Sequence, residues 1–266
     1  MKPKAYIDTV CILFKKKPPN KLFNDLKRNC RKAPRLHPTK ERGSHGYKWK
    51  LSVHVPTRQA MECLARLPDA LVNELHVAFD LPASDVNAAF ALQELIESQL
   101  WIASARAFGC RRFRQTFYSG LPKWDALRIC IYSDKPSRHN GGPVCHVELR
   151  FRGANQVRRV GLLDIGDITE LDPAAIVGRF LQLRRLSLRK LGRMFGGRPL
   201  LSTANEDRRA GFLAAADATA QFAPWANLIL LEAVRWYCIE YGINIRRALR
   251  RSSDYIANVT NLDVFA

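Results

Sequence analysis

The sequence predicts an α+β protein: a largely antiparallel sheet with one face packed on helices, followed by a C-terminal helical region. Segments that alternate apolar and polar residues recur as far as residue 152, and beyond Gly161 the pattern becomes helical. Strands that come first and helices that follow are typical of α+β proteins. We therefore expect a sheet-based part, 1–163, and a helical part, 164–266. Neither GxxxxGK[ST] nor GxGxxG occurs, which argues against a P-loop ATPase or a dinucleotide enzyme.

The individual elements follow from the same patterns. The predicted strands are 5–14, 47–55, 74–81, 112–118, 126–133 and 144–152. A helical pattern runs from Pro56 to about Leu67, and Ser84 is the expected N-cap of a helix that continues to about Ala107. The segment 15–45 is rich in Lys, Arg, Pro and Asn, which predicts a long basic loop. The predicted C-terminal helices are 173–195, 202–222 and 225–251.

Positive charge dominates the composition. The chain of 266 residues has 43 Lys and Arg against 24 Asp and Glu, a formal charge of +19. The first 50 residues alone hold 15 cationic and three acidic side chains, or +12. With 47% hydrophobic residues, the chain is too rich in core-forming side chains to be a disordered basic tail. The charge therefore predicts a folded protein with a polyanionic partner.

The cysteines and the apolar segments indicate the compartment. Seven cysteines form no CxxC pair and no regular spacing, which predicts reduced thiols rather than a disulfide framework or a zinc site. The apolar run near the N-terminus is too short for a signal peptide. The stretch 224–239 carries two charges and is shorter than the roughly 20 residues that span a bilayer. We expect a soluble, cytoplasmic protein with no membrane partner.

The polar faces of the predicted strands carry an unusual concentration of cations. Alternate residues of a strand share a face, so the polar sets of five strands would form one exposed surface if the strands share a sheet. The cations expected to contact a phosphate backbone are Lys48, Lys50, Arg112, Arg114, Arg128, Arg150 and Arg152. The alternative is an ordinary solvated sheet face.

Two acids and a histidine stand among these cations. Asp80 ends one strand, and His146 and Glu148 lie side by side on the polar face of another. Carboxylates with substrate phosphate suit Mg²⁺ or Mn²⁺, and a histidine can add a ligand for Mn²⁺. We predict Asp80, Glu148 and His146 as metal ligands. The alternative is that Glu148 pairs with an arginine and Asp80 caps the following helix.

Tyr118 and Tyr132 fall on the same polar face. A tyrosine hydroxyl that attacks a metal-polarised phosphodiester forms a 5′-phosphotyrosyl link and frees a 3′-OH. Either tyrosine can equally be an ordinary surface or hydrogen-bonded core residue.

Several segments resemble the Rep proteins, the initiators of rolling-circle replication of small plasmids and filamentous phages. The segments that carry the resemblance are Tyr6–Val10, Leu75–Asp80, Thr116–Gly120, Arg128–Lys135 and Val147–Arg150. They resemble, in order, the family's opening strand, its acidic strand, its Tyr-x-Gly segment, its Arg-hydrophobic-Tyr-Asp-Lys strand and its Arg-hydrophobic-Glu-hydrophobic-Arg strand. The family's acidic strand has two acids, and the position of the first is occupied here by an apolar residue, Val77 or Ala78.

The resemblance implies a site-specific, metal-dependent DNA nickase. It implies Asp80 and Glu148 as metal ligands and Tyr118 as the nucleophile, with Tyr132 as second choice. Lys135 would contact the phosphate or the leaving group. The favoured hypothesis is thus replication initiation by binding of the double-stranded origin DNA and nicking of one strand. A second copy of the chain, in a homodimer, is a further candidate partner. The alternatives are a non-catalytic repressor or packaging factor on the same fold and an RNA-binding protein.

Overall fold

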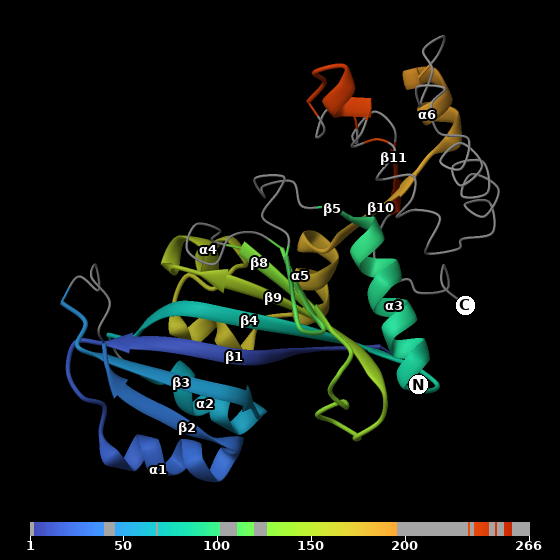
Figure 1. Cartoon of the computed structure of the whole chain (residues 1–266). Coiled ribbons are helices and arrows are strands. Elements are labelled where there is room, and N and C mark those ends of the chain that lie inside the picture. The colour runs from blue at the N-terminus through green and yellow to red at the C-terminus, as the bar shows by residue number, and fades with distance from the viewer. Residues whose placement is uncertain are drawn as a thin grey trace. The chain divides into compact units, whose positions relative to one another are not determined.

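Figure 1 shows the computed structural model of the chain. The structure describes residues 3–39, 46–67, 69–101, 111–119, 127–195, 234, 237–244, 248 and 253–256. Two compact units interleave along the sequence. The first comprises 1–80, 118–130 and 146–180, and the second comprises 81–117, 131–145 and 181–266.

The main sheet has eight strands, and β4 and β9 lie at its centre. Across the sheet the order is β2 (Cys30–Pro38), β3 (Trp49–Pro56), β1 (Lys4–Phe14), β4 (Leu71–Pro82), β9 (Val144–Arg152), β8 (Leu127–Tyr132), β7 (Thr116–Tyr118) and β6 (Arg111–Phe113). The pairs β2–β3, β3–β1 and β1–β4 are antiparallel. The α+β class with a largely antiparallel sheet is therefore confirmed.

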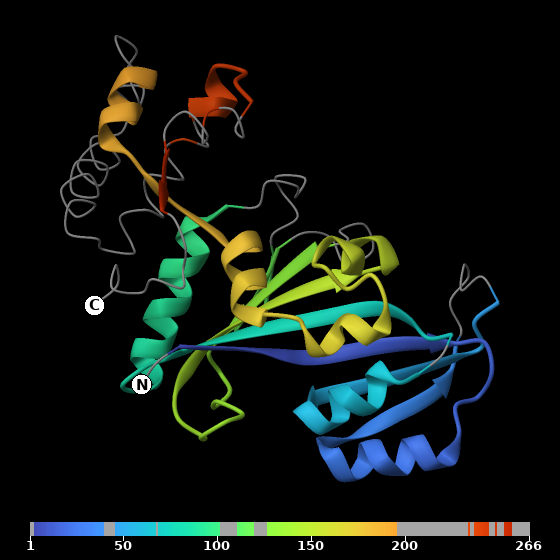
Figure 2. The same cartoon turned by 180° about the vertical axis from the view of Figure 1, so that it is seen from behind.

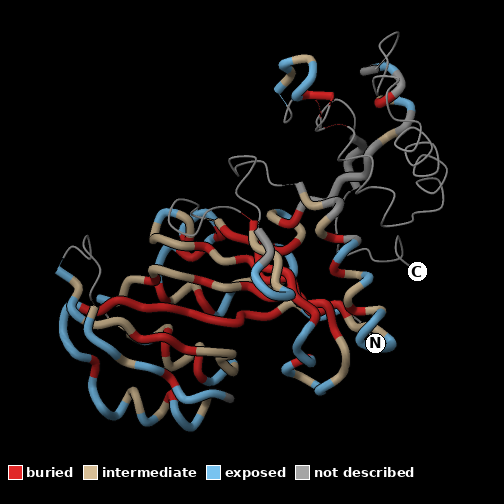
Figure 3. Tube along the Cα trace, viewed as in Figure 1, coloured by how far each residue is buried: buried red, intermediate tan, exposed pale blue. Residues whose placement is uncertain are grey.

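In the first unit, helices cover one face of this sheet. They are α1 (Asn20–Asn29), α2 (Arg58–Ala65), α4 (Ala154–Arg159), the short 3-10 helix η1 (Ile165–Thr169) and α5 (Pro173–Phe180). Figure 2 shows α2 and α5 on the same side of the strands. Strands β1 and β9 are buried along most of their length (Figure 3). On the apolar side the fully buried side chains include Val77, Val147 and Leu149, and Phe151 packs edge-to-face on Phe180 at 5.0 Å.

The second unit contains a helix and a small second sheet. Helix α3 (Val86–Gln99) begins at Asp85, whose side chain accepts a hydrogen bond from the Ala88 amide at 2.9 Å. The small sheet has the order β11 (Ser253–Ile256), β10 (Gln182–Leu186), β5 (Leu100–Trp101), and helix α6 (Leu188–Phe195) follows β10. Among the described residues, no helix is long and apolar enough to cross a membrane.

The predicted basic loop 15–45 is wrong in its central part. Helix α1 and strand β2 occupy residues 20–38 of this segment. Strand β2 hydrogen-bonds along β3, and Leu26 anchors α1 with a completely buried side chain. The hydrogen-bond partners of β2 come from β3, and the local pattern of apolar residues in 15–45 does not reveal this pairing.

Three other elements differ from the prediction. The helix expected from Ser84 has Asp85 as its N-cap and ends at Gln99, where the chain becomes β5. The strand predicted over 112–118 is two strands, β6 and β7, because Arg114 between them has a left-handed φ of 54°.

The helix predicted over 173–195 is interrupted by β10, whose partners β5 and β11 come from distant parts of the sequence. The predicted helix 202–222 and most of 225–251 lie outside the described residues.

Candidate metal and phosphate site

A β-bulge in β1 brings Asp8 to the polar face of the sheet. Ile7 pairs with Val77 and Thr9 pairs with His76, so β1 has one more residue here than β4. Bulges interrupt the alternation of a strand and re-aim a side chain. The Thr9 hydroxyl donates a hydrogen bond to Asp8 Oδ2 at 2.9 Å and lies 3.0 Å from His54 Nδ1, so neighbouring strands hold the bulge residues.

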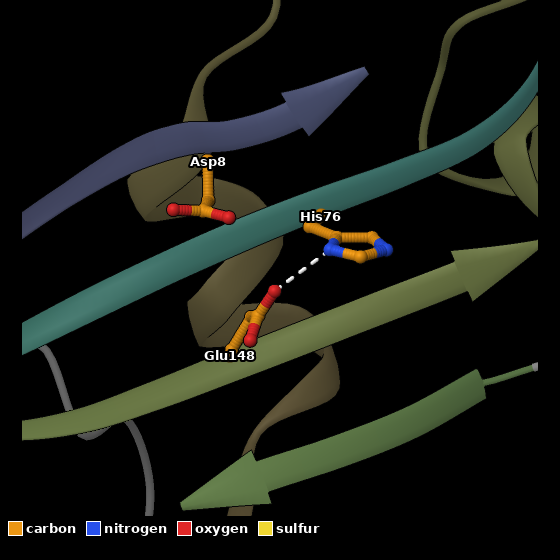
Figure 4. A group of neighbouring side chains, drawn as sticks. All are labelled: Asp8, His76 and Glu148. Carbon is orange, nitrogen blue, oxygen red and sulfur yellow. Dashed lines mark ion pairs between the residues drawn. The ribbon is translucent and has the colours of Figure 1, made fainter. Parts of the chain in front are cut away.

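Asp8, His76 and Glu148 converge from three neighbouring strands (Figure 4). One ligand atom from each lies within 4.8 Å of the other two. His76 Nδ1 is 2.7 Å from Glu148 Oε1. Asp8 and Glu148 are buried, and little of the His76 side chain reaches solvent. Two carboxylates and an imidazole therefore face a common point on the sheet.

This donor set fits a divalent cation. Mg²⁺ binds oxygen ligands at about 2.0–2.1 Å, so opposite ligands of one ion stand roughly 4 Å apart. The observed spread of up to 4.8 Å needs only a small side-chain adjustment to reach that value. An imidazole in the set favours Mn²⁺ over Mg²⁺. Asp8, His76 and Glu148 could thus hold a metal ion, although the sequence predicted only the last of the three as a ligand.

Glu74 fixes the far side of the His76 ring. Its Oε1 lies 2.8 Å from His76 Nε2 and 3.0 Å from Arg152 Nε, and its Oε2 lies 3.6 Å from Lys50 Nζ. A carboxylate on the second ring nitrogen orients the imidazole, as is usual for metal-binding histidines. The His76 ring is thereby directed with Nδ1 toward Asp8 and Glu148.

Opposed effects set the ionisation of this cluster. Burial alone would raise the pKa of Glu74, but the hydrogen bond and charge of His76, with Arg152 and Lys50, lower the pKa to about 2. Burial would likewise raise the pKa of Glu148, but the hydrogen bonds and charges of His76 and Arg150 lower it. Burial would lower the pKa of His76. The hydrogen bonds and charges of Glu148 and Glu74 raise this pKa, and their effect is larger than that of burial. Both glutamates are therefore ionised at neutral pH.

Asp80 and His146 form a separate buried pair. His146 Nδ1 lies 2.6 Å from Asp80 Oδ1, and the Tyr6 hydroxyl donates to the same oxygen at 3.3 Å. Of the three predicted ligands, the structure thus joins Asp80 to His146 and places Glu148 in the cluster with Asp8 and His76. Asp85, not Asp80, caps the following helix.

The expectation that the polar face is exposed is wrong at its centre. Asp80 and His146 are each 2% exposed, Glu148 is 4% and Arg128 is 6% exposed. Asp80 pairs with His146 and Glu148 pairs with His76 across neighbouring strands, and this pairing lets the two acids lie in a buried position. Glu148 also pairs with an arginine, as the alternative to metal binding predicted: Arg150 Nη2 lies 2.6 Å from Glu148 Oε2.

Next to this cluster, two arginines lie between Glu148 and Tyr118. Arg150 follows Glu148 on β9, and Arg128 is on the adjacent strand β8. The Arg128 guanidinium stacks 4.2 Å from the centre of the Tyr118 ring, a cation–π contact. Burial lowers the pKa of Arg150, but Glu148 outweighs this effect and Tyr118 contributes in the same direction. Tyr118 therefore lies within electrostatic range of Arg150.

The remaining predicted residues have other surroundings. Tyr132 is buried and Lys135 is exposed, with the Lys135 Nζ 5.1 Å from the Tyr132 ring, and both belong to the second unit. Lys48 is exposed, whereas Lys50 and Arg152 pair with Glu74. Arg114 is exposed, 5.7 Å from the Phe113 ring. The side chain of Arg112 lies outside the described part of the chain.

Comparisons with known proteins assign neither a family nor a function to the chain. The sequence matches no protein family, and no curated protein matches it. Among solved structures, the chain is similar to the rolling-circle replication initiator protein from Geobacillus stearothermophilus, with a TM-score of 0.42 and 17% sequence identity. The likeness covers 67% of this chain and 85% of the other. A likeness this distant assigns no function, so the side chains described above must carry the functional hypothesis.

Proposed function

We propose that the protein initiates rolling-circle replication by nicking one DNA strand through Tyr118, with Mg²⁺ or Mn²⁺ held by Asp8, His76 and Glu148. One observation carries the proposal. Across the neighbouring strands β1, β4, β9, β8 and β7, the polar face presents a metal-ligand cluster, then two arginines, then a tyrosine. These are the three parts that a tyrosine nickase needs.

The spacing of these parts suits one phosphodiester. Neighbouring strands lie about 4.8 Å apart, so β7 is roughly 10 Å from β9, a gap that a phosphate group and a tyrosine side chain can bridge. Arg128 holds the Tyr118 ring by stacking on it. The motifs that resemble Rep proteins include Tyr118, Arg128 and Glu148, which supports giving these three residues a role in the proposal.

The proposed reaction is a transesterification. The Tyr118 hydroxyl oxygen attacks phosphorus, the P–O3′ bond breaks, and the 5′ phosphate becomes esterified to the tyrosine. The hydroxyl proton is lost and the 3′ oxygen gains a proton, so the number of phosphoester bonds is conserved. A bound divalent cation would polarise a non-bridging phosphate oxygen. Arginines next to the nucleophile favour the charge that develops on those oxygens.

The decisive experiment is detection of the covalent adduct. A supercoiled circle carrying the origin of the protein's own replicon is incubated with the protein and Mn²⁺. We expect nicked circles whose 5′ ends carry protein. Tyr118→Phe should abolish both products, and the matched variant Tyr132→Phe should keep them. Retention of the adduct in Tyr118→Phe would contradict the assignment of the nucleophile, and its loss only in Tyr132→Phe would move that role to the second tyrosine.

The Glu148–Arg150 pair favours one alternative, a nucleic-acid-binding protein without nicking activity. A carboxylate already paired at 2.6 Å to a guanidinium is a poorer metal ligand than a free one. This alternative predicts origin binding with neither nicks nor adduct for the unmodified protein at any Mn²⁺ concentration. The same assay therefore separates the two functions, provided that binding of the origin DNA is measured in parallel.

A further inference from the structure

The Glu148 carboxylate is shared between two cationic partners on opposite sides. Its Oε1 lies 2.7 Å from His76 Nδ1, and its Oε2 lies 2.6 Å from Arg150 Nη2. Both oxygens are therefore engaged before any metal is bound. A cation that enters beside Asp8 and His76 must share Glu148 with Arg150, and two positive groups on one buried carboxylate repel each other.

Arg150 has a buried hydrogen-bond donor that can bind a second anion. Among the described residues, its buried Nε has no hydrogen-bond acceptor. A guanidinium offers five donors in a planar fork that matches a phosphate group. Arg150 stands on β9, and the adjacent strand β8 carries Arg128, which stacks on the Tyr118 ring. A phosphate bound by this fork would therefore lie on the side of the cluster where the proposed nucleophile is held. An unused buried donor therefore points to a ligand at this position.

The local charge balance supports the same conclusion. An imidazole must give up a proton to ligate a metal, so His76 counts as neutral once the site is filled. The charged side chains described in and around the cluster are then three carboxylates and three cations: Asp8, Glu74 and Glu148 against Lys50, Arg150 and Arg152. A divalent cation would change this balance from zero to +2. A buried excess of positive charge is unfavourable unless an anion accompanies it.

We propose that Arg150 couples metal binding to phosphate binding: a divalent cation at Asp8, His76 and Glu148 displaces Arg150 from Glu148, and Arg150 then binds one phosphodiester group of the DNA. This inference rests on the proposed function and adds to it the order in which the metal and the phosphate bind. The phosphate site becomes available when the metal site is filled. By thermodynamic linkage, bound DNA must strengthen metal binding by the same factor.

The test measures both affinities without any nicking. All proteins carry Tyr118→Phe, so no adduct can form. The affinity for a fluorescein-labelled 20-nucleotide dT strand is measured by anisotropy with and without Mn²⁺ at constant ionic strength. Mn²⁺ affinity is measured from the electron paramagnetic resonance signal of the free ion, with and without the oligonucleotide. We expect each ligand to tighten the other by about tenfold, within the usual range of such couplings.

Arg150→Gln has a distinctive expected signature. Mn²⁺ should bind more tightly than in the parent, because Glu148 has lost a competing cation, and the mutual strengthening should disappear. Arg152→Gln is the matched control: it removes the same charge from the same strand, but Arg152 pairs with Glu74 rather than with Glu148. The control should keep the coupling. Any general loss of DNA affinity from one fewer positive charge is then common to both variants.

The outcomes are separable from those of the nicking assay. Coupling that persists in Arg150→Gln, or Mn²⁺ affinity that does not rise in it, would overturn the inference even if the protein nicks DNA. If Arg150→Gln does not fold, Arg150→Lys serves instead. It keeps the charge and loses the fork, so it should reduce the coupling several-fold, and an undiminished coupling would refute the role of Arg150.

Discussion

Replacing Glu74 by glutamine is expected to destabilise the protein at neutral pH and to have little effect in acid. The Glu74 carboxylate is held by His76, Arg152 and Lys50, and its side chain is only 13% exposed. Its pKa is about 2 in the folded protein against an ordinary value of 4.5. Between these values the unfolded chain binds more protons, so stability falls as the pH falls.

The size of the effect follows from that difference in pKa. About 2.5 pKa units correspond to roughly 3.4 kcal/mol. Because the carboxylate retains some contact with water and salt, we expect about 2–3 kcal/mol. This contribution is fully present above about pH 4.5 and is lost as the pH falls toward 2. The difference between the two proteins should therefore close over that interval.

The assay is urea unfolding followed by tryptophan fluorescence at pH 7 and at steps between pH 5 and pH 2.5. Glu62→Gln is the control, because Glu62 forms an exposed pair with Arg58 at 3.3 Å and should contribute well under 1 kcal/mol. A stability difference for Glu74→Gln that stays constant across this pH range would refute the electrostatic reasoning and indicate lost packing instead. A difference smaller than that of Glu62→Gln at pH 7 would refute it as well.

Three further predictions concern the core, a helix cap and the metal ligands. Leu75→Ala, which truncates a completely buried side chain of β4, should lower the free energy of unfolding by about 2–5 kcal/mol in urea titrations. Thr57 caps α2 by accepting a hydrogen bond from the Ala60 amide at 3.2 Å, so Thr57→Ala should cost about 1 kcal/mol by the same measurement. Asp8→Asn should weaken Mn²⁺ binding by about tenfold or more in the paramagnetic resonance titration, because it removes a charged ligand. Asp80→Asn should change it by less than about threefold, and the reverse ranking would favour a site at Asp80.

The sequence reveals the strands that carry the site better than it reveals the site itself. Strands β4 and β9 follow a clear alternation, so their polar faces and Glu148 can be predicted directly. Asp8 cannot, because the bulge in β1 depends on how β1 pairs with β4. The available signal is a single charged residue inside an apolar strand. His76 stands on the predicted polar face, but its selection as a ligand requires knowledge that Glu74 and Glu148 flank it.

Elements built by distant pairing are missed for the same reason. Strand β10 has a sequence with helical periodicity and becomes extended because β5 and β11 supply its backbone partners. Strand β2 lacks apolar alternation and is defined by its hydrogen bonds to β3. Helix α2 is predicted correctly because its signal is local: Thr57 caps it, and the apolar residues Ala60 and Leu64 follow at helical spacing.

The two carboxylate–histidine pairs on this sheet illustrate why a pair alone does not define a metal site. His76 and His146 each have Nδ1 within 2.7 Å of a carboxylate oxygen. Around His76 there are three carboxylates, and two of them face the point where an ion would lie. His146 and Asp80 belong to no such group of three possible metal ligands in the part of the chain that the structure describes. A divalent cation gains far more from two buried anionic ligands than from one. The accumulation of negative charge around a single imidazole, rather than the imidazole–acid pair itself, is what distinguishes the candidate site.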